Sequence, residues 1–128
     1  MVRTDTDTIV LELDVPNPGL SGLMRAHGAG SACLATAFNP FSQARTPAWN
    51  EAANARLRAW LEERGWPILA GEGCCDDGEW APEQSFLAFG PGVDDAKAIC
   101  VRFDQNAVVF AGPDAVPRLL FHPGLAIE

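Results

Sequence analysis

The chain switches repeatedly between short apolar runs and stretches in which apolar residues recur at helical spacing. The runs are short enough to be strands, and they lie at 32–38, 66–71, 85–90 and 106–112. Between them, 46–64 and 93–103 carry apolar side chains at intervals of three and four, which predicts amphipathic helices. From residue 32 onward the predicted order is strand, helix, strand, strand, helix, strand.

The first of these helices has clear local signals. Thr46 and Pro47 suit an N-cap and a first helical position, and Gly65 suits the left-handed residue that follows a helix. One predicted buried stripe contains Trp49, Ala53, Leu57, Trp60 and Leu61. A second face, with Asn50, Asn54, Arg58 and Glu62, steps by four. Two asparagines inside a helix are unusual, since their side chains compete with the backbone for hydrogen bonds.

This order of elements predicts an α+β protein with a ferredoxin-like βαββαβ core over 32–111. In such a core the first and third strands are central, and here these are 32–38 and 85–90, the most uniformly apolar runs. Helices on one face leave the other face of these strands open, so a second cover is expected. Residues 8–27 or another copy of the chain could supply it. We also expect an additional N-terminal strand at 8–15 and a short C-terminal edge strand after residue 113.

Length and charge limit the classes of function. The 128 residues suit a single domain, divided into an extension (1–30), a core (32–112) and a tail (113–128). A formal net charge of −8 argues against nucleic acid and anionic membranes as partners. The chain has no apolar run long enough to span a bilayer and no signal-peptide pattern, so a cytoplasmic location is expected.

The four cysteines do not indicate a metal or redox site. Cys33 lies in a strand pattern and Cys100 in a helix pattern, where free cysteines behave as small buried apolar residues. Cys74 and Cys75 are adjacent and lack the CxxC spacing of a zinc or dithiol site. We therefore expect no metal site, and the sequence names no cofactor.

The predicted topology brings polar segments that are far apart in the sequence to one edge of the sheet, called here the carboxamide rim. Its candidate ligand-binding residues are Asn39, Ser42, Asn50, Asn54, Trp80 and Gln105. A carboxamide both donates and accepts hydrogen bonds without carrying charge, which suits recognition of a polar ligand. The same side chains have structural alternatives: Asn39 could cap a turn, Asn50 and Asn54 could tie the helix to a loop, and Trp80 could anchor its loop to the core.

Four segments resemble the domain of unknown function numbered 3293, a bacterial family. They are "TAFNPFS" (36–42), "NEAANARLRAWLEERG" (50–65), "GEWAPEQSFLAFG" (78–90) and "RFDQNAVVF" (102–110). The resemblance covers about 32–112 and departs from the family pattern at Asp104, where glycine is usual. No established activity follows from it.

Three functions remain open at this point. The leading hypothesis is a binding module that holds a small polar or planar ligand at the carboxamide rim. In the second, Glu72 or Glu83 acts as a general acid or base, or the two share a divalent cation. The third is a protein-interaction scaffold that forms a homodimer and uses the rim only structurally.

Overall fold

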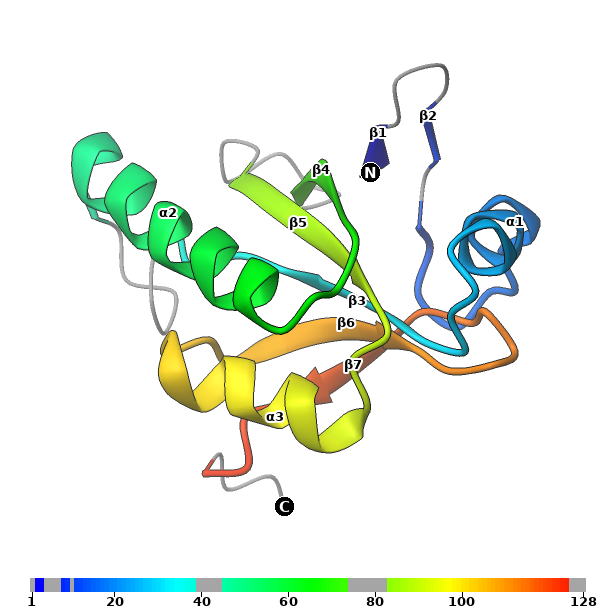
Figure 1. Cartoon of the computed structure of the whole chain (residues 1–128). Coiled ribbons are helices and arrows are strands. Elements are labelled where there is room, and N and C mark those ends of the chain that lie inside the picture. Colours follow the sequence, from blue (N-terminus) through cyan, green and yellow to red (C-terminus); the bar gives the residue numbers. More distant parts are fainter. Residues whose placement is uncertain (1, 4–7, 10, 39–44, 74–82, 125–128) are drawn as a thin grey trace.

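The computed structural model describes residues 2–3, 8–9, 11–38, 45–73 and 83–124. Within these ranges the chain forms three helices and an antiparallel sheet, so the fold is α+β (Figure 1). The helices are α1 (Pro18–Ala26), α2 (Pro47–Glu63) and α3 (Val93–Arg102). The strands are β1 (Val2–Arg3), β2 (Thr8–Ile9), β3 (Ala32–Ala35), β4 (Ile68–Gly73), β5 (Glu83–Phe89), β6 (Ala107–Ala111) and β7 (Arg118–Phe121).

The strands are ordered β2-β1-β4-β5-β3-β6-β7, and each pairs with its neighbours in antiparallel orientation. The two apolar runs expected beside each other at the centre, β3 and β5, are neighbours there. Leu34 of β3 lies opposite Leu87 of β5 on one side and Val109 of β6 on the other. The predicted C-terminal edge strand is present as β7.

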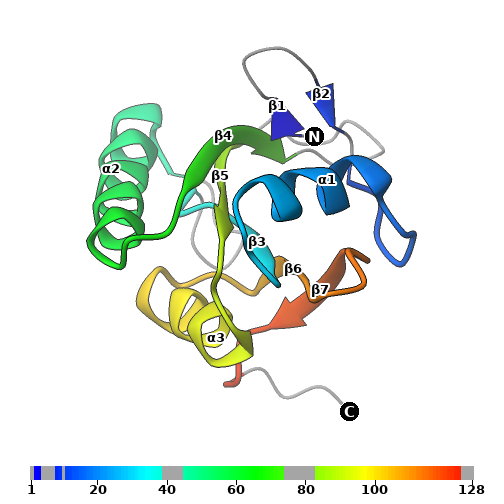
Figure 2. The same cartoon turned by 45° about the vertical axis from the view of Figure 1, so that its right-hand side comes forward.

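Helices cover both faces of the sheet (Figures 1 and 2). On one face, α2 and α3 bury a cluster that includes Cys33, Leu57, Leu61, Phe86 and Ile99. On the other, α1 places Leu20 and Met24 against Ala32, Leu87, Phe89 and Ala111 of the sheet. The second cover that the central strands require therefore comes from within residues 8–27 of the same chain.

The N-terminal strand predicted over 8–15 is wrong from residue 11 onward. The strand there is Thr8–Ile9, and the following segment turns at Asp14, whose φ is 65°. Backbone hydrogen bonds from Asp14 N–H to Pro117 O (2.7 Å) and from Asn17 N–H to Ala115 O (3.1 Å) hold it against the C-terminal segment. These distant partners prevail over the local alternation of apolar residues, which is typical of a strand.

The helix ends follow the local signals. The Thr46 hydroxyl accepts a hydrogen bond from Trp49 N–H at 3.1 Å, and Gly65 has a φ of 77°. Asp104, which follows the end of α3 where the family usually has glycine, adopts a left-handed conformation with a φ of 53°, which aspartate tolerates better than most residues. Among the described residues, no helix is both long and apolar enough to cross a bilayer.

Candidate functional site

Helix α2 has two adjacent stripes of buried residues, and Ala53 and Trp60 belong to one of them. The other stripe contains Asn50, Asn54, Leu57 and Leu61, which are spaced four, three and four apart and are all buried. The prediction that Trp49 belongs to the buried stripe is wrong, because this residue is 40% exposed. Helical spacing identifies residues that share a face, but it does not fix how far the helix is rotated toward the sheet.

Asn54 joins α2 to the ends of two strands. Its Oδ1 accepts a hydrogen bond from Ala37 N–H (2.7 Å), and its Nδ2 donates to the carbonyl of Gln84 (2.7 Å). Continuing the β3–β5 register beyond Ala35↔Phe86 would place Ala37 opposite Gln84. The carboxamide of Asn54 thus occupies the position between two backbone groups that would otherwise face each other in the ladder.

This arrangement explains why β3 is shorter than the predicted 32–38. The ladder ends at Ala35, and Asn54 and Thr36 supply the hydrogen bonds beyond it. The Thr36 hydroxyl donates to Gln84 O at 2.7 Å and accepts from Phe38 N–H at 3.1 Å. The backbone at the end of β3 is therefore held by side chains, and its groups remain paired as burial requires.

Gln105 reaches the same segment from the opposite side. Its Nε2 donates to the carbonyls of Phe38 (3.1 Å) and Phe103 (3.2 Å), and its side chain is buried. Asn50 is also buried, and its Nδ2 lies 3.5 Å from Arg45 O. Asn54 and Gln105 thus both bind the backbone of residues 36–38. Their hydrogen bonds fix the conformation of this part of the rim. Ligand contacts by Asn50, Asn54 and Gln105 stay a prediction.

Other predicted site residues fall outside what the structure describes. Asn39, Ser42 and Trp80 lie outside the described residues, as do Cys74 and Cys75. The backbones of Glu72 and Glu83 belong to β4 and β5, but their side chains are outside the described part. The proposed roles of all these residues stay predictions.

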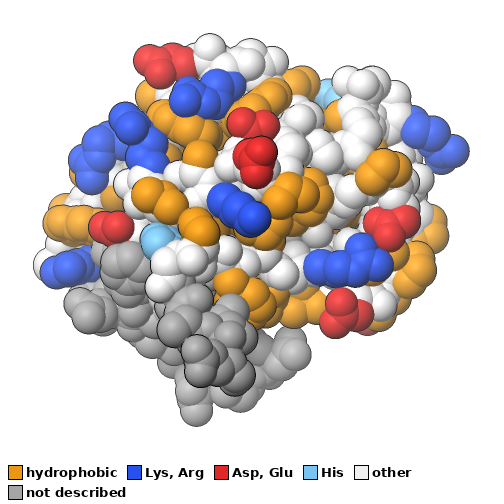
Figure 3. All heavy atoms as spheres, turned by 90° about the horizontal axis from the view of Figure 1, so that it is seen from below, with side chains coloured by type: hydrophobic (Ala, Val, Ile, Leu, Met, Phe, Trp, Pro, Cys, Tyr) orange, Lys and Arg blue, Asp and Glu red, His pale blue; other side chains and the backbone are white. Residues whose placement is uncertain are grey.

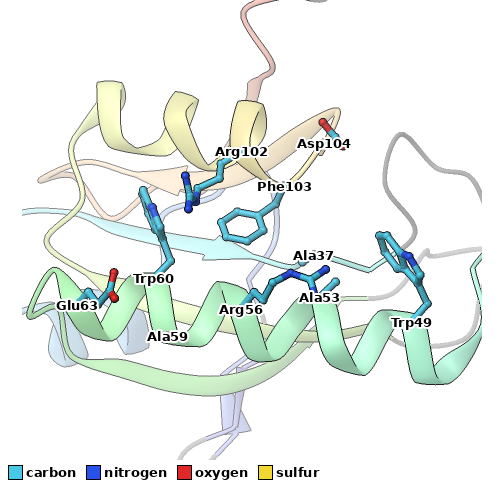
Figure 4. Close-up of a pocket in the computed structure, with 10 residues that line it drawn as sticks. All are labelled: Ala37, Trp49, Ala53, Arg56, Ala59, Trp60, Glu63, Arg102, Phe103 and Asp104. Atoms are coloured by element: carbon cyan, nitrogen blue, oxygen red, sulfur yellow. The ribbon is translucent and has the colours of Figure 1, made fainter.

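A groove between α2 and α3 lies beside the rim (Figure 4). Its volume is about 510 Å³, within the range of small-molecule sites. We call it the interhelix groove, and its lining consists of Ala37, Trp49, Ala53, Arg56, Ala59, Trp60, Glu63, Arg102, Phe103 and Asp104. Small alanines leave room between the helices, and the aromatic side chains form walls.

The wall around Trp60 is held in place by its neighbours. The Arg64 guanidinium lies 3.5 Å from the centroid of the Trp60 ring. Phe103 and Trp66 contact Trp60 edge-on, each with a ring centroid at 6.1 Å. At the other end of α2, Arg45 lies 5.3 Å from the centroid of Trp49. An aromatic wall that is fixed before binding suits the face of a planar ligand.

Charged side chains also line the interhelix groove. Figure 4 shows Arg56 on α2 and Arg102 on α3 between the two helices, with Glu63 toward one end of the lining and Asp104 toward the other. Sequence reasoning missed this site. Its signal was the series Trp49, Ala53, Arg56, Trp60 and Glu63, which repeats at intervals of four and three.

The described thiols lie in the core rather than in the groove. Cys33 and Cys100 are buried, as their patterns predicted, and desolvation by burial raises the pKa of both thiols. They are therefore poor nucleophiles. Among the described residues, no group of three or more His, Cys, Asp or Glu side chains is placed to hold a metal ion.

Exposed apolar side chains come from several separate segments. They are Leu13, Val15, Trp49, Val93, Val101, Leu119 and Phe121. On the face seen from below in Figure 3, apolar side chains are interspersed with acidic and basic ones. Dispersed residues of this kind are normal on a protein surface, so they do not by themselves define an interface.

Comparison with known proteins gives one match. The family model described as a protein of unknown function, DUF3293, matches residues 35–108, which is more than half of the chain. The matched region begins in β3 and ends in β6, so it contains both helices that line the groove. No curated protein and no solved structure matches the chain.

Proposed function

The chain belongs to the family of proteins of unknown function DUF3293, and we propose that it is a binding module for a small planar molecule held in the interhelix groove. The observation that carries this proposal is the lining of that groove. Trp49, Trp60 and Phe103 offer aromatic surface around a volume of about 510 Å³. Such side chains bind planar rings through dispersion and stacking.

The buried carboxamides support this function by shaping the groove. Asn54 fixes Ala37, which belongs to the lining, and Gln105 binds the carbonyl of Phe103, whose ring is a wall. The hydrogen bonds of the rim therefore set the position of two groove residues. In this proposal Asn50, Asn54 and Gln105 preorganise the site, and any direct contact with the ligand is an additional role.

The ferredoxin-like description of the core belongs to the same proposal. It is supported by the antiparallel order β4-β5-β3-β6 and by the position of α2 and α3 on one face of the sheet. In that arrangement the two crossover helices lie side by side over the sheet, and the space between them is available to a ligand.

The proposal is tested by filling the groove. Ala59 is exposed and lines the groove, so Ala59→Trp should fill part of it without entering the core. A thermal-shift screen of small aromatic molecules should yield compounds that raise the melting temperature of the unaltered chain. The same compounds should have little effect on the Ala59→Trp variant.

Ala55→Trp is the matched control, because Ala55 is also an exposed residue of α2 but does not line the groove. It should respond to the compounds as the unaltered chain does. Compounds that stabilise both variants equally would place binding elsewhere and contradict the proposal, and so would a screen that finds no binder.

A further inference from the structure

We propose that the molecule in the interhelix groove is an aromatic anion, with its ring against the aromatic walls and its anionic group attracted by the positive charges of Arg56 and Arg102. This inference rests on the proposed function and specifies the chemical class of the ligand. Arginine binds carboxylate and phosphate groups through paired N–H donors in a planar fork. Figure 4 shows the two guanidinium groups on either side of the Phe103 ring, that of Arg102 toward Trp60 and that of Arg56 toward Ala53, so an anionic group in the groove would lie in the positive field of both.

The two arginines have no partner of their own in the described part of the chain. Of the other arginines, Arg58 pairs with Glu62 at 3.7 Å, Arg118 pairs with Asp114 at 3.2 Å, and Arg64 lies against Trp60. Within the described residues Arg25 also forms no ion pair or side-chain hydrogen bond, but it is in the last turn of α1, where a cation is favoured. Within those same residues, no ion pair or side-chain hydrogen bond is formed by Arg56 or Arg102. Their donors are available to a ligand, although acidic residues outnumber basic ones by seventeen to nine in the whole chain.

A favourable interaction with the negative end of a helix explains only one of the two arginines. Arg102 is in the last turn of α3, where a cation complements the negative end of the helix. Arg56 is in the middle of α2, where this interaction is absent. Arg56 is exposed on the groove side of α2, so its guanidinium is accessible to an anionic ligand in the groove.

The two acidic residues of the lining lie away from the space between the two arginines. Glu63 and Asp104 lie toward opposite ends of the lining, and Arg56 and Arg102 lie between them (Figure 4). The Phe103 ring lies between the two guanidinium groups, and Trp60 lies on the side of Arg102, so a molecule with its ring against Phe103 can direct a negative group toward either arginine. A positively charged ring substituent at the same place would be repelled.

The test compares three probes that share one ring and differ in charge. They are indole-3-acetate (anionic), indole-3-acetamide (neutral) and tryptamine (cationic), each titrated into the full chain at low salt by calorimetry. We expect indole-3-acetate to bind at least about threefold to tenfold more tightly than the amide, as partly exposed charge-assisted hydrogen bonds allow. Tryptamine should bind most weakly. Added salt should narrow these differences.

Variants then assign the charge preference to the two arginines. Arg56→Gln and Arg102→Gln should each reduce the preference for acetate over amide, while Arg58→Gln, which alters the exposed side of the same helix, should leave it unchanged. Equal binding of acetate and amide, tighter binding of tryptamine, or a preference that survives both groove variants would overturn the inference. Failure of indole-3-acetate to bind at millimolar concentration would overturn it too.

These outcomes separate the inference from the function on which it rests. If the amide binds as well as the acetate and Ala59→Trp abolishes both, the groove is a ligand site and only the charge assignment fails. If Ala59→Trp leaves the binding of every probe unchanged, the groove is not their site and the proposed function fails with the inference.

Discussion

At the scale of single residues, the carboxamide of Asn54 takes the place of a peptide group. A side-chain amide has the same donor and acceptor as the backbone, so it can be inserted between Ala37 and Gln84 without leaving either unpaired. Asn54 thus has a structural explanation that its poor helix propensity alone would not predict. The sequence indicated that the residue was special, but its partners are 17 and 30 positions away.

Replacing Asn54 should therefore destabilise the fold. Asn54→Ala leaves the buried N–H of Ala37 without its acceptor, and we expect the free energy of unfolding to fall by about 2–3 kcal/mol. Urea denaturation followed by circular dichroism measures this change. Arg58→Ala, on the exposed side of α2, should change stability by less than about 0.5 kcal/mol. A loss at Asn54 as small as that of the control would show that its two hydrogen bonds contribute little.

At the scale of elements, local signals predicted helix ends better than they predicted how helices are placed. Thr46, Gly65 and Asp104 have the conformations that their residue types favour, because capping depends on neighbours within one turn. The exposure of Trp49 and the groove beside it depend on the rotation of α2 and its separation from α3. The spacing of apolar residues along the sequence determines neither the rotation of α2 nor its distance from α3.

Two glycines offer a matched test of this local control. An added Cβ would meet no atom within 4 Å at Gly22 or at Gly65, but only Gly65 has a positive φ. Gly22→Ala, inside α1, should stabilise the protein by about 0.5–1 kcal/mol through helix propensity. Gly65→Ala should destabilise it by about 1 kcal/mol through left-handed strain. Thermal unfolding of both variants gives the signs, and equal signs would contradict this explanation.

At the scale of the whole molecule, one chain covers both faces of its own sheet. Leu20 and Met24 of α1 lie over the central strands on the face away from α2 and α3. The apolar character of β3 and β5 on both faces is thereby explained without a second copy of the chain. The sequence predicted the need for a cover, but it could not choose between α1 and a partner subunit, since both would bury the same side chains.

The interhelix groove is also a property of the whole molecule. Its lining comes from the end of β3, from α2 and from the end of α3, and the hydrogen bonds of Asn54 and Gln105 join these three elements. Predicting it required the distance between two helices, which depends on the alanines between them and on the strands below. The rim and the groove are therefore linked, because buried amide side chains of the rim bind the backbone of residues that line the groove.

The most direct test of the ligand site is a nuclear magnetic resonance titration of the ¹⁵N-labelled chain with indole-3-acetate. The structure predicts that the largest amide shifts fall in 49–63 and 102–104, which line the groove from both helices, while amides of α1 and β7 remain unchanged. Shifts concentrated on α1 or β7, or binding detected by calorimetry without shifts along α2, would contradict a ligand site between the helices.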